Sequence, residues 1–336
     1  MTLLKVSDLR IWYPVQKGIF SRLGYVKAVD GVSFSLNERE TLALVGESGS
    51  GKTTLGRATL GLIKPTAGHI IFDGKDLTKI TDKKQLMEFR RKTAMIFQDP
   101  FSSLSPTFPV FRILEEPLII HGVKSKEERV NIVYRALELV KLQPVELFAA
   151  KYPHMLSGGQ RQRVAIARAL ILGPKYVVAD EPVSMLDASV RVEILYLLRE
   201  LQEKLGLAFL YITHDIATAK YFSHKIAVMY AGKIVEYGET REVLRNPIHP
   251  YTQALISTLP DPDPKNRFRM MVVIKGEPPN LMNPPSGCRF HPRCPFANEK
   301  CSTEEPFLRE INEGHFVSCH YAGEVFIKET TTSAVS

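Results

Sequence analysis

Short apolar runs alternate with amphipathic stretches along most of the chain, and their order predicts a sheet flanked by helices. TLALV (41–45), YVVA (176–179) and AFLYIT (208–213) are continuous apolar runs, as in strands buried on both faces. HIIF and TAMIF (69–72 and 93–97) are further predicted strands, and helices are predicted from residue 52 and over 110–172 and 189–204. This alternation favours an α/β fold with a mainly parallel sheet and helices on both faces.

The two ends of the chain depart from this pattern. Residues 3–45 are rich in strand-like runs such as VSFSL (32–36), and KIAVMY and KIVEYG (225–230 and 233–238) predict a hairpin. After residue 251 the sequence becomes proline-rich, with LPDPDP, GEPPN and NPPSG. We therefore place a boundary at 245–265, between a main domain (1–250) and a small irregular domain (251–336).

Composition narrows the class of protein only slightly. Of 336 residues, 44% are apolar and 24% are charged, as in ordinary globular proteins. The net charge of +8 is compatible with a nucleic acid, a phosphate ligand or an anionic membrane surface, and equally with a solvated lysine-rich surface. The chain has no apolar stretch of membrane-spanning length and no signal peptide at its start, so we expect a cytosolic location.

The segment GESGSGKT (46–53) matches the phosphate-binding pattern G-x-x-x-x-G-K-[ST]. Its glycines allow several backbone N–H groups to point inward, and the helix that follows adds a positive N-terminus. Lys52 would bind the outer phosphates, and the Thr53 hydroxyl is a suitable ligand for Mg²⁺. The apolar strand before the loop makes a chance match improbable.

Polar residues follow three of the predicted strands. Asp180 and Glu181 end YVVADE, where Asp180 would complete the Mg²⁺ shell and Glu181 would orient an attacking water. His214 in YITHD and Gln98 in MIFQDP lie at the ends of two other strands. Each of these residues alone would more often be an ordinary loop or structural residue, so only their combination points to a site.

A second anion-binding helix start lies at LSGGQ (156–160). Ser157 and Gln160 form a capping box, which explains both residues structurally. A capping box does not require Gly158 and Gly159, which would let a bulky anion approach the backbone N–H groups.

The order GESGSGKT, Gln98, LSGGQ, YVVADE, SMLD (184–187) and His214 resembles the nucleotide-binding subunit of an ATP-binding-cassette (ABC) transporter. The resemblance covers about residues 1–250 and implies a P-loop NTPase fold. In such a fold an antiparallel β subdomain and a helical subdomain (about 100–172) accompany the parallel sheet. It also implies that two subunits pack head to tail, with each ATP between the P-loop of one chain and the LSGGQ helix of the other.

The resemblance assigns roles to matching positions. It implies a phosphate-binding loop made by Gly46, Glu47, Ser48, Gly49, Ser50, Gly51, Lys52, Thr53 and Thr54. Thr53, Gln98 and Asp180 would surround Mg²⁺, Glu181 would be the catalytic base, and His214 would contact the γ-phosphate. Residues reaching into the partner's site would be Ser157, Gly158, Gly159 and Gln160, with Asp187 on the loop between the two sites. An aromatic ring should stack on adenine, and we expect Tyr13, with Trp12 as the alternative.

All four cysteines, Cys288, Cys294, Cys301 and Cys319, lie in the last fifty residues of the chain. Their spacing lacks C-x-x-C, so it differs from the common zinc ribbon. Four thiolates suit a zinc ion or an iron–sulfur cluster, and two disulfides would be unusual in the cytosol. The tail resembles the C-terminal extension of oligopeptide/dipeptide ABC importers, which implies a [4Fe–4S] cluster, with zinc or free thiols as alternatives. Nearby histidines, at 291, 315 and 320, are expected at the surface.

The segment 13–34 resembles the second, F-type, ATPase subunit of peptide importers. The resemblance implies a subunit at the cytoplasmic face of the membrane with four kinds of partner or substrate. These are a second ATP-binding subunit, identical or homologous, two transmembrane permeases, an extracytoplasmic binding protein acting indirectly, and a peptide. The loop DPFSSLSP (99–106) would dock a permease helix.

Other readings of the sequence are weaker. Nickel, glutathione and oligosaccharides are other substrates of this importer branch. A soluble ABC ATPase acting on DNA or ribosomes would need a coiled-coil insertion or a second cassette, and we find neither, so we expect no nucleic-acid partner. A non-enzymatic iron–sulfur sensor is disfavoured by the intact Glu181.

Overall fold

The computed structural model describes residues 1–17, 21–258, 274 and 276–325. Its main sheet has the strand order β11-β12-β10-β9-β3-β8-β7-β6. The five strands from β9 to β6 run parallel, and β10, β12 and β11 add antiparallel strands at one edge. The strand bounds are β3 Thr41–Val45, β6 Thr93–Ile96, β7 Tyr176–Asp180, β8 Ala208–Thr213, β9 Lys225–Tyr230, β10 Lys233–Glu239, β11 Arg309–Asn312 and β12 His315–Val317.

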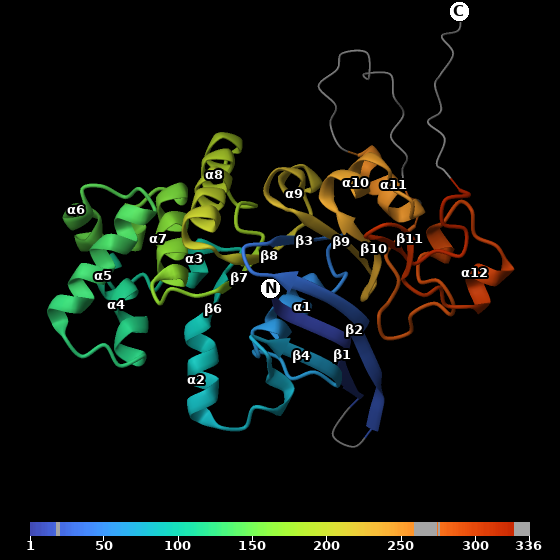
Figure 1. Ribbon diagram of the computed structural model, residues 1–336, viewed down its shortest axis with the longest axis horizontal. Coiled ribbons are helices and arrows are strands. Elements are labelled where there is room, and N and C mark those ends of the chain that lie inside the picture. The colour runs from blue at the N-terminus through green and yellow to red at the C-terminus, as the bar shows by residue number, and fades with distance from the viewer. Residues whose placement is uncertain (18–20, 259–273, 275, 326–336) are drawn as a thin grey trace, which may run out of the picture.

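The central strands are buried on both faces, which explains their continuous apolar sequences. In β3 every residue is buried, and side chains alternate between two hydrophobic cores: Leu42 and Leu44 belong to one, Ala43 and Val45 to the other. Helix α1 (Lys52–Thr59) lies below these strands in Figure 1, and α8 (Ala188–Leu205) and α9 (Ile216–Phe222) lie above them. The predicted parallel sheet with helices on both faces is confirmed.

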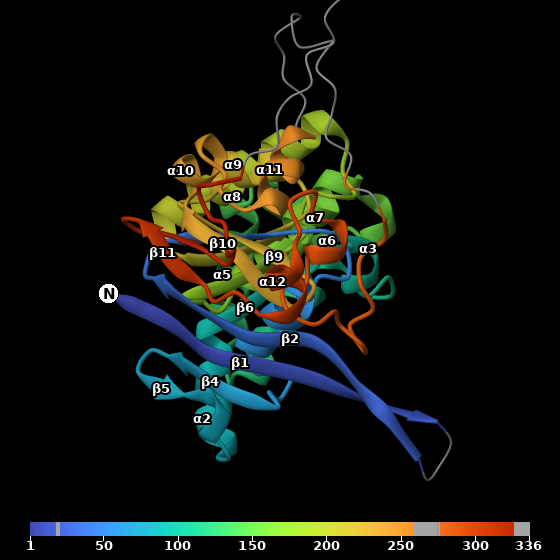
Figure 2. The same cartoon turned by 90° about the vertical axis from the view of Figure 1, so that its right-hand side faces the viewer.

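A second, antiparallel sheet has the order β2-β1-β4-β5. Its strands are β1 Thr2–Lys17, β2 Ser21–Asn37, β4 Ala67–Phe72 and β5 Lys75–Asp76. Strands β1 and β2 form the long ribbon that extends to the lower right in Figure 2. Helix α2 (Lys83–Lys92), which the sequence analysis missed, connects this sheet to β6.

Helices gather at one end of the main sheet, at the left in Figure 1. They are α3 Pro100–Ser103, α4 Val110–Ile120, α5 Lys126–Leu139, α6 Val145–Ala150 and α7 Gly158–Leu170. Ser125 accepts the N–H of Glu128 and caps α5, as its sequence predicts. A helical region close to the predicted span is therefore present.

The C-terminal part differs from the expected irregular tail in one respect. Strand β12 pairs with β10, so the hairpin β11–β12 extends the main sheet at its β10 edge. The remaining C-terminal helices are α10 Thr240–Arg245, α11 Pro250–Ser257 and α12 Glu299–Thr303. The proline-rich LPDPDP segment (259–264) lies outside the described residues, as do residues 265–273 and 275.

Candidate functional site

The predicted phosphate-binding loop connects β3 to α1. Gly51 adopts φ +104°, and a Cβ there would lie 2.1 Å from the carbonyl oxygen of Ala28, so no other residue fits. Lys52 is buried inside the loop. Its Nζ donates to the carbonyl oxygens of Gly46 (2.7 Å) and Glu47 (2.8 Å). The loop therefore encloses its own lysine at the N-terminus of a helix, as an anion site requires.

Two predicted Mg²⁺ ligands meet beside this loop. Thr53 Oγ1, in the first turn of α1, donates to Asp180 Oδ1, at the end of β7, over 3.0 Å. Burial raises the pKa of Asp180, and the Thr53 bond opposes this rise. Burial likewise lowers the pKa of Lys52, whereas Glu181, Asp180 and Glu47 raise it. A buried carboxylate and a buried ammonium thus lie beside one loop, as in a site that binds a metal–phosphate complex.

Glu181 connects the ends of three strands. Gln98 Nε2 donates to Glu181 Oε2 over 3.0 Å, and His214 Nδ1 lies 3.0 Å from Glu181 Oε1. Glu181 itself has φ +46°, which a non-glycine residue adopts at a cost of about 1–3 kcal/mol, and such strain concentrates at functional sites. The structure therefore brings Gln98, Glu181 and His214 together, as the sequence analysis predicted from their positions at strand ends.

The LSGGQ segment forms the start of α7 and has the expected capping box. Ser157 Oγ accepts the N–H of Gln160 (3.3 Å), and Gln160 Oε1 accepts the N–H of Ser157 (3.1 Å). Gly159 also has a packing requirement that the sequence did not show, since a Cβ there would lie 2.6 Å from Cγ1 of Val190 on α8. A Cβ at Gly158 would make only an ordinary contact, 3.6 Å from Leu186. In Figure 1, α7 lies among the helices at the left, whereas α1 lies below the middle of the sheet, so the two helices predicted to receive anions lie in different parts of the chain.

Two other predicted residues, Asp187 and Tyr13, lie at exposed positions, whereas Trp12 is half-buried. Asp187 is the exposed N-cap of α8, and its side chain makes no capping hydrogen bond. Tyr13 on β1 is 39% exposed. Trp12 is engaged within the protein: its Nε1 donates to Asp30 over 3.1 Å, and Lys27 Nζ lies 5.0 Å from its ring centre. Of the two aromatic candidates, Tyr13 has the less occupied ring.

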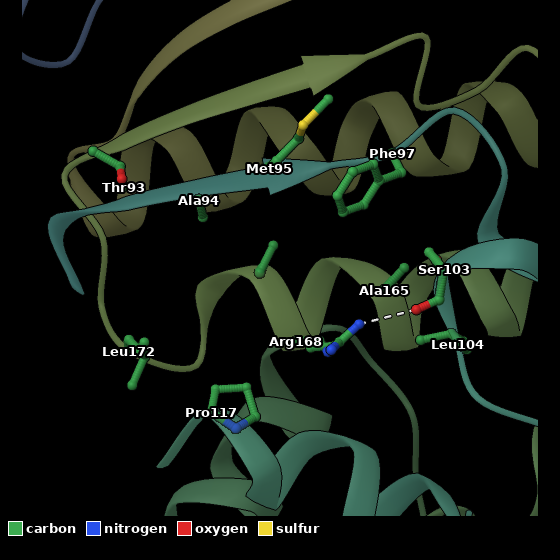
Figure 3. A pocket seen from close by; sticks show the side chains of 11 residues that line it. Thr93, Ala94, Met95, Phe97, Ser103, Leu104, Pro117, Ala165, Arg168 and Leu172 are labelled. Atoms are coloured by element: carbon green, nitrogen blue, oxygen red, sulfur yellow. Dashed lines mark hydrogen bonds between the residues drawn. The ribbon is translucent and has the colours of Figure 1, made fainter. Parts of the chain in front are cut away.

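A cavity of about 230 Å³ separates β6 from α7 (Figure 3). Phe97, 42% exposed, lies on its sheet side, and Arg168 on its helix side donates to the carbonyl oxygen of Ser103 over 2.9 Å. A second cavity of about 310 Å³ shares Ser103 and Arg168 and includes Phe108, which is 49% exposed. Exposed aromatic rings beside a concave surface are typical of a protein-binding site.

The four cysteines are all free thiols. Burial, with a smaller contribution from neighbouring cysteines, raises the pKa of Cys288 to about 12 and that of Cys294 to about 11. Burial also raises the pKa of Cys319, to which Cys301 contributes. Across the described part of the chain, however, no three His, Cys, Asp or Glu side chains are placed to hold a metal ion. Other cysteines thus contribute to these pKa shifts, but the described side chains are not placed as metal ligands, so the geometry does not support the [4Fe–4S] prediction.

Comparison with known proteins gives the same class of protein as the sequence motifs. The ABC transporter family matches residues 29–184, and the oligopeptide/dipeptide transporter C-terminal region matches residues 235–301. The chain belongs to the ABC transporter family of ATP-binding proteins, and it is an ATPase subunit of that class.

Several relatives match nearly the whole chain. The oligopeptide transport ATP-binding protein AppF of Bacillus subtilis is 45% identical, over 95% of this chain and 97% of its own. The putative oligopeptide transport ATP-binding protein YkfD of the same organism is 46% identical, over 98% of each chain. Among solved structures, the dimeric ATP-binding cassette MJ0796 bound to ADP and Pi is 32% identical with a TM-score of 0.62, over 71% of this chain and 99% of its own. Within the described residues, no helix combines the length and apolarity that crossing a membrane would require.

Proposed function

We propose that this chain is the ATP-hydrolysing subunit of a peptide importer. The observation that carries the proposal is that the P-loop side of an ATPase site is joined to a tail matching the oligopeptide/dipeptide transporter C-terminal region. Relatives named as oligopeptide transport ATP-binding proteins match this chain from end to end, tail included. Nickel, glutathione and oligosaccharides remain competing substrates of the same motor.

We infer that each ATP is bound by two chains. The P-loop binds the phosphates through its backbone N–H groups and Lys52. The first N–H groups of α7, with Ser157 and Gly158, would bind phosphate too, but α7 lies in a different part of the chain from α1. A head-to-tail dimer with a second ATP-binding subunit would place α7 of one chain opposite the P-loop of the other. Gln160 would keep the Ser157 cap rigid, and Asp187, exposed at the start of α8, would lie at the subunit boundary.

Hydrolysis then depends mainly on positioning and charge. Mg²⁺, held by Thr53, Asp180 and Gln98, would neutralise phosphate charge. Glu181 accepts the proton of the attacking water and orients it, because its two carboxylate oxygens are fixed by Gln98 and His214. His214, 59% exposed, can turn toward the γ-phosphate. Tyr13 would stack on adenine, since its ring is exposed.

The two cavities that share Ser103 and Arg168 suit a permease helix. Phe97 and Phe108 offer exposed rings, and the lining segment 102–105 belongs to the loop region predicted to dock a membrane subunit. Gln98 follows Phe97 in the chain and contacts Glu181 directly. A permease helix bound at Phe97 would therefore lie next to the residue that senses whether ATP has been hydrolysed. Two permease subunits would hold the motor at the cytoplasmic face of the membrane, and a binding protein on the other side would deliver the peptide.

The test is uptake by the reconstituted complex. Proteoliposomes containing this chain, its partner ATPase and both permeases are given the binding protein and a radiolabelled peptide, with or without ATP. We expect ATP-dependent uptake that is lost with Glu181→Gln. ATP-dependent uptake of nickel, glutathione or an oligosaccharide, with no uptake of di- to hexapeptides, would refute peptide import.

We also propose that the four cysteines hold a [4Fe–4S] cluster. The support is chemical: Cys288, Cys294, Cys301 and Cys319 are free, and metal binding would deprotonate buried thiols that are otherwise neutral. Anaerobic purification should yield brown protein with about four irons and four sulfides per chain. Colourless protein with one zinc, or with four titratable thiols and no metal, would contradict the cluster.

A further inference from the structure

The segment between Cys288 and Cys294 docks onto the ATPase core through both of its arginines. Arg293 has only 8% of its side chain exposed and forms a two-pronged ion pair with Glu47, with Nη1–Oε2 and Nη2–Oε1 distances of 2.9 and 3.2 Å. The two residues lie 246 positions apart in the chain. Such bidentate guanidinium–carboxylate pairs fix direction as well as distance. The tail therefore reaches the second residue of the phosphate-binding loop.

Glu47 is engaged at all of its polar groups. Its N–H donates to the hydroxyl of Tyr251 over 2.9 Å, its carboxylate accepts from Arg293, and its carbonyl oxygen accepts from Lys52 Nζ over 2.8 Å. Only Glu47 therefore stands between Arg293 and the P-loop lysine, because it contacts both of them. Glu47 is the mechanical link between the tail and the group that binds phosphate.

The support beneath this ion pair is rigid. Phe290 from the tail is 1% exposed and packs against both Tyr230 and Tyr251, with its ring centre 5.2 and 5.4 Å from theirs. Tyr230 and Tyr251 are themselves 4.6 Å apart, and the Tyr230 hydroxyl accepts from Arg293 Nη1 over 3.3 Å. Well-packed aromatic clusters resist displacement, so Arg293 is held in one direction.

A second anchor fixes the same segment on the other side. Arg289, nearly buried, donates to the Asp30 carboxylate and to the carbonyl oxygen of Ala231. Asp30 also accepts from Trp12 Nε1. The tail is thus tied to the β1–β2 ribbon, which carries Tyr13, as well as to the P-loop.

We infer that Arg293 is a positioning residue for ATP binding. Acting through Glu47, it holds the first turn of the P-loop in the conformation that receives phosphate. The C-terminal segment is in this way a working part of the nucleotide site rather than an appendage. The inference requires only ATP binding at the P-loop, so it holds whichever solute the transporter carries.

The experiment compares Arg293→Met, Glu47→Gln and the double variant in the assembled transporter. ATPase assays give KM and kcat, and a fluorescent ATP analogue gives the Kd for the full-length chain. We expect Arg293→Met to raise KM and Kd about tenfold, as loss of a charge-assisted bond would, with kcat changed far less. Glu47→Gln should have a similar effect, and the double variant should be no worse than Arg293→Met alone, because both changes break one link. Arg293→Lys should restore part of the affinity.

The matched control is Glu305→Gln, which removes the ion pair between the tail and Lys233 on β10. It weakens tail docking without touching Glu47, so KM should stay within about twofold of wild type. Melting temperatures of every variant separate unfolding from repositioning, and Glu47→Gln serves if Arg293→Met does not fold. An unchanged KM in Arg293→Met or Glu47→Gln, an equal rise in Glu305→Gln, or additive effects in the double variant would each overturn the inference. If the variants show the expected differences in ATP binding but the wild-type complex does not take up peptide, the proposed substrate is refuted and the role of Arg293 is not.

Discussion

The two glycines of LSGGQ allow the packing role of this segment to be separated from its proposed role in binding the partner's ATP. In Gly158→Ala the new Cβ would lie 3.6 Å from Leu186 Cδ2, an ordinary contact, so the free energy of unfolding should change by less than about 0.5 kcal/mol. In Gly159→Ala the Cβ would lie 2.6 Å from Val190 Cγ1, a stiff β-branched side chain on α8. Overpacking of this kind lowers the free energy of unfolding by about 1–3 kcal/mol. The higher helix propensity of alanine offsets up to about 1 kcal/mol of this loss.

If the N-terminus of α7 binds the phosphate held by the partner chain, the Gly158→Ala variant should be as stable as wild type but should hydrolyse ATP more slowly. A methyl group at the first helical position would lengthen a hydrogen bond to a charged oxygen, which is worth about 1.5–3 kcal/mol. Phosphate release by the assembled transporter should then fall about 10- to 100-fold. Urea unfolding provides the stability measurement, and Gly159→Ala provides a variant with measurable destabilisation for comparison. Wild-type phosphate release by Gly158→Ala would refute close approach of phosphate to this helix.

Three further outcomes are expected. Glu181→Gln should bind ATP normally and release no phosphate, because the water loses its base; single-turnover phosphate release at the wild-type rate would rule out that role. Ser157→Arg subunits mixed with wild type should lower ATPase activity more than simple dilution does, because each damages its neighbour's site, and activity proportional to the wild-type fraction would count against trans assembly. Burial lowers the pKa of His249 from 6.5 to about 4, so the unfolded chain takes up the proton first and the free energy of unfolding should fall as pH drops from 6.5 toward 4. His249→Asn, which keeps a side-chain acceptor for the cap of α11, should flatten that fall in urea unfolding at pH 7 and pH 5; an identical pH dependence in both proteins would show that His249 is not its source.

The residues of the nucleotide site were predictable because each lies in a local pattern. Lys52 and Thr53 belong to a contiguous loop, and Glu181 and His214 end apolar strands, so parallel-sheet geometry alone brings them together. Gly159 has an additional packing requirement that could not be predicted, since its contact with Val190 joins two helices whose packing no short motif encodes.

The role of the tail could not be predicted in the same way. The ion pair between Arg293 and Glu47 joins two segments that were assigned to separate domains, and neither residue has a local signature for the other. The pairing of β12 with β10 was missed for a related reason: three residues, His315–Val317, are too short a strand for alternation to be visible. Long-range docking is decided by complementary surfaces, which become visible only once both are folded.

The central claim is that each ATP is shared between two chains, and the rate of hydrolysis per chain on dilution tests it most directly. Phosphate release is measured for the isolated chain from micromolar to low nanomolar concentration at saturating ATP, beside the assembled transporter. The account predicts that the rate per chain falls toward zero as the isolated chain is diluted, whereas the assembled transporter keeps its rate. An isolated chain that hydrolyses ATP at the transporter's rate at every concentration would contradict it.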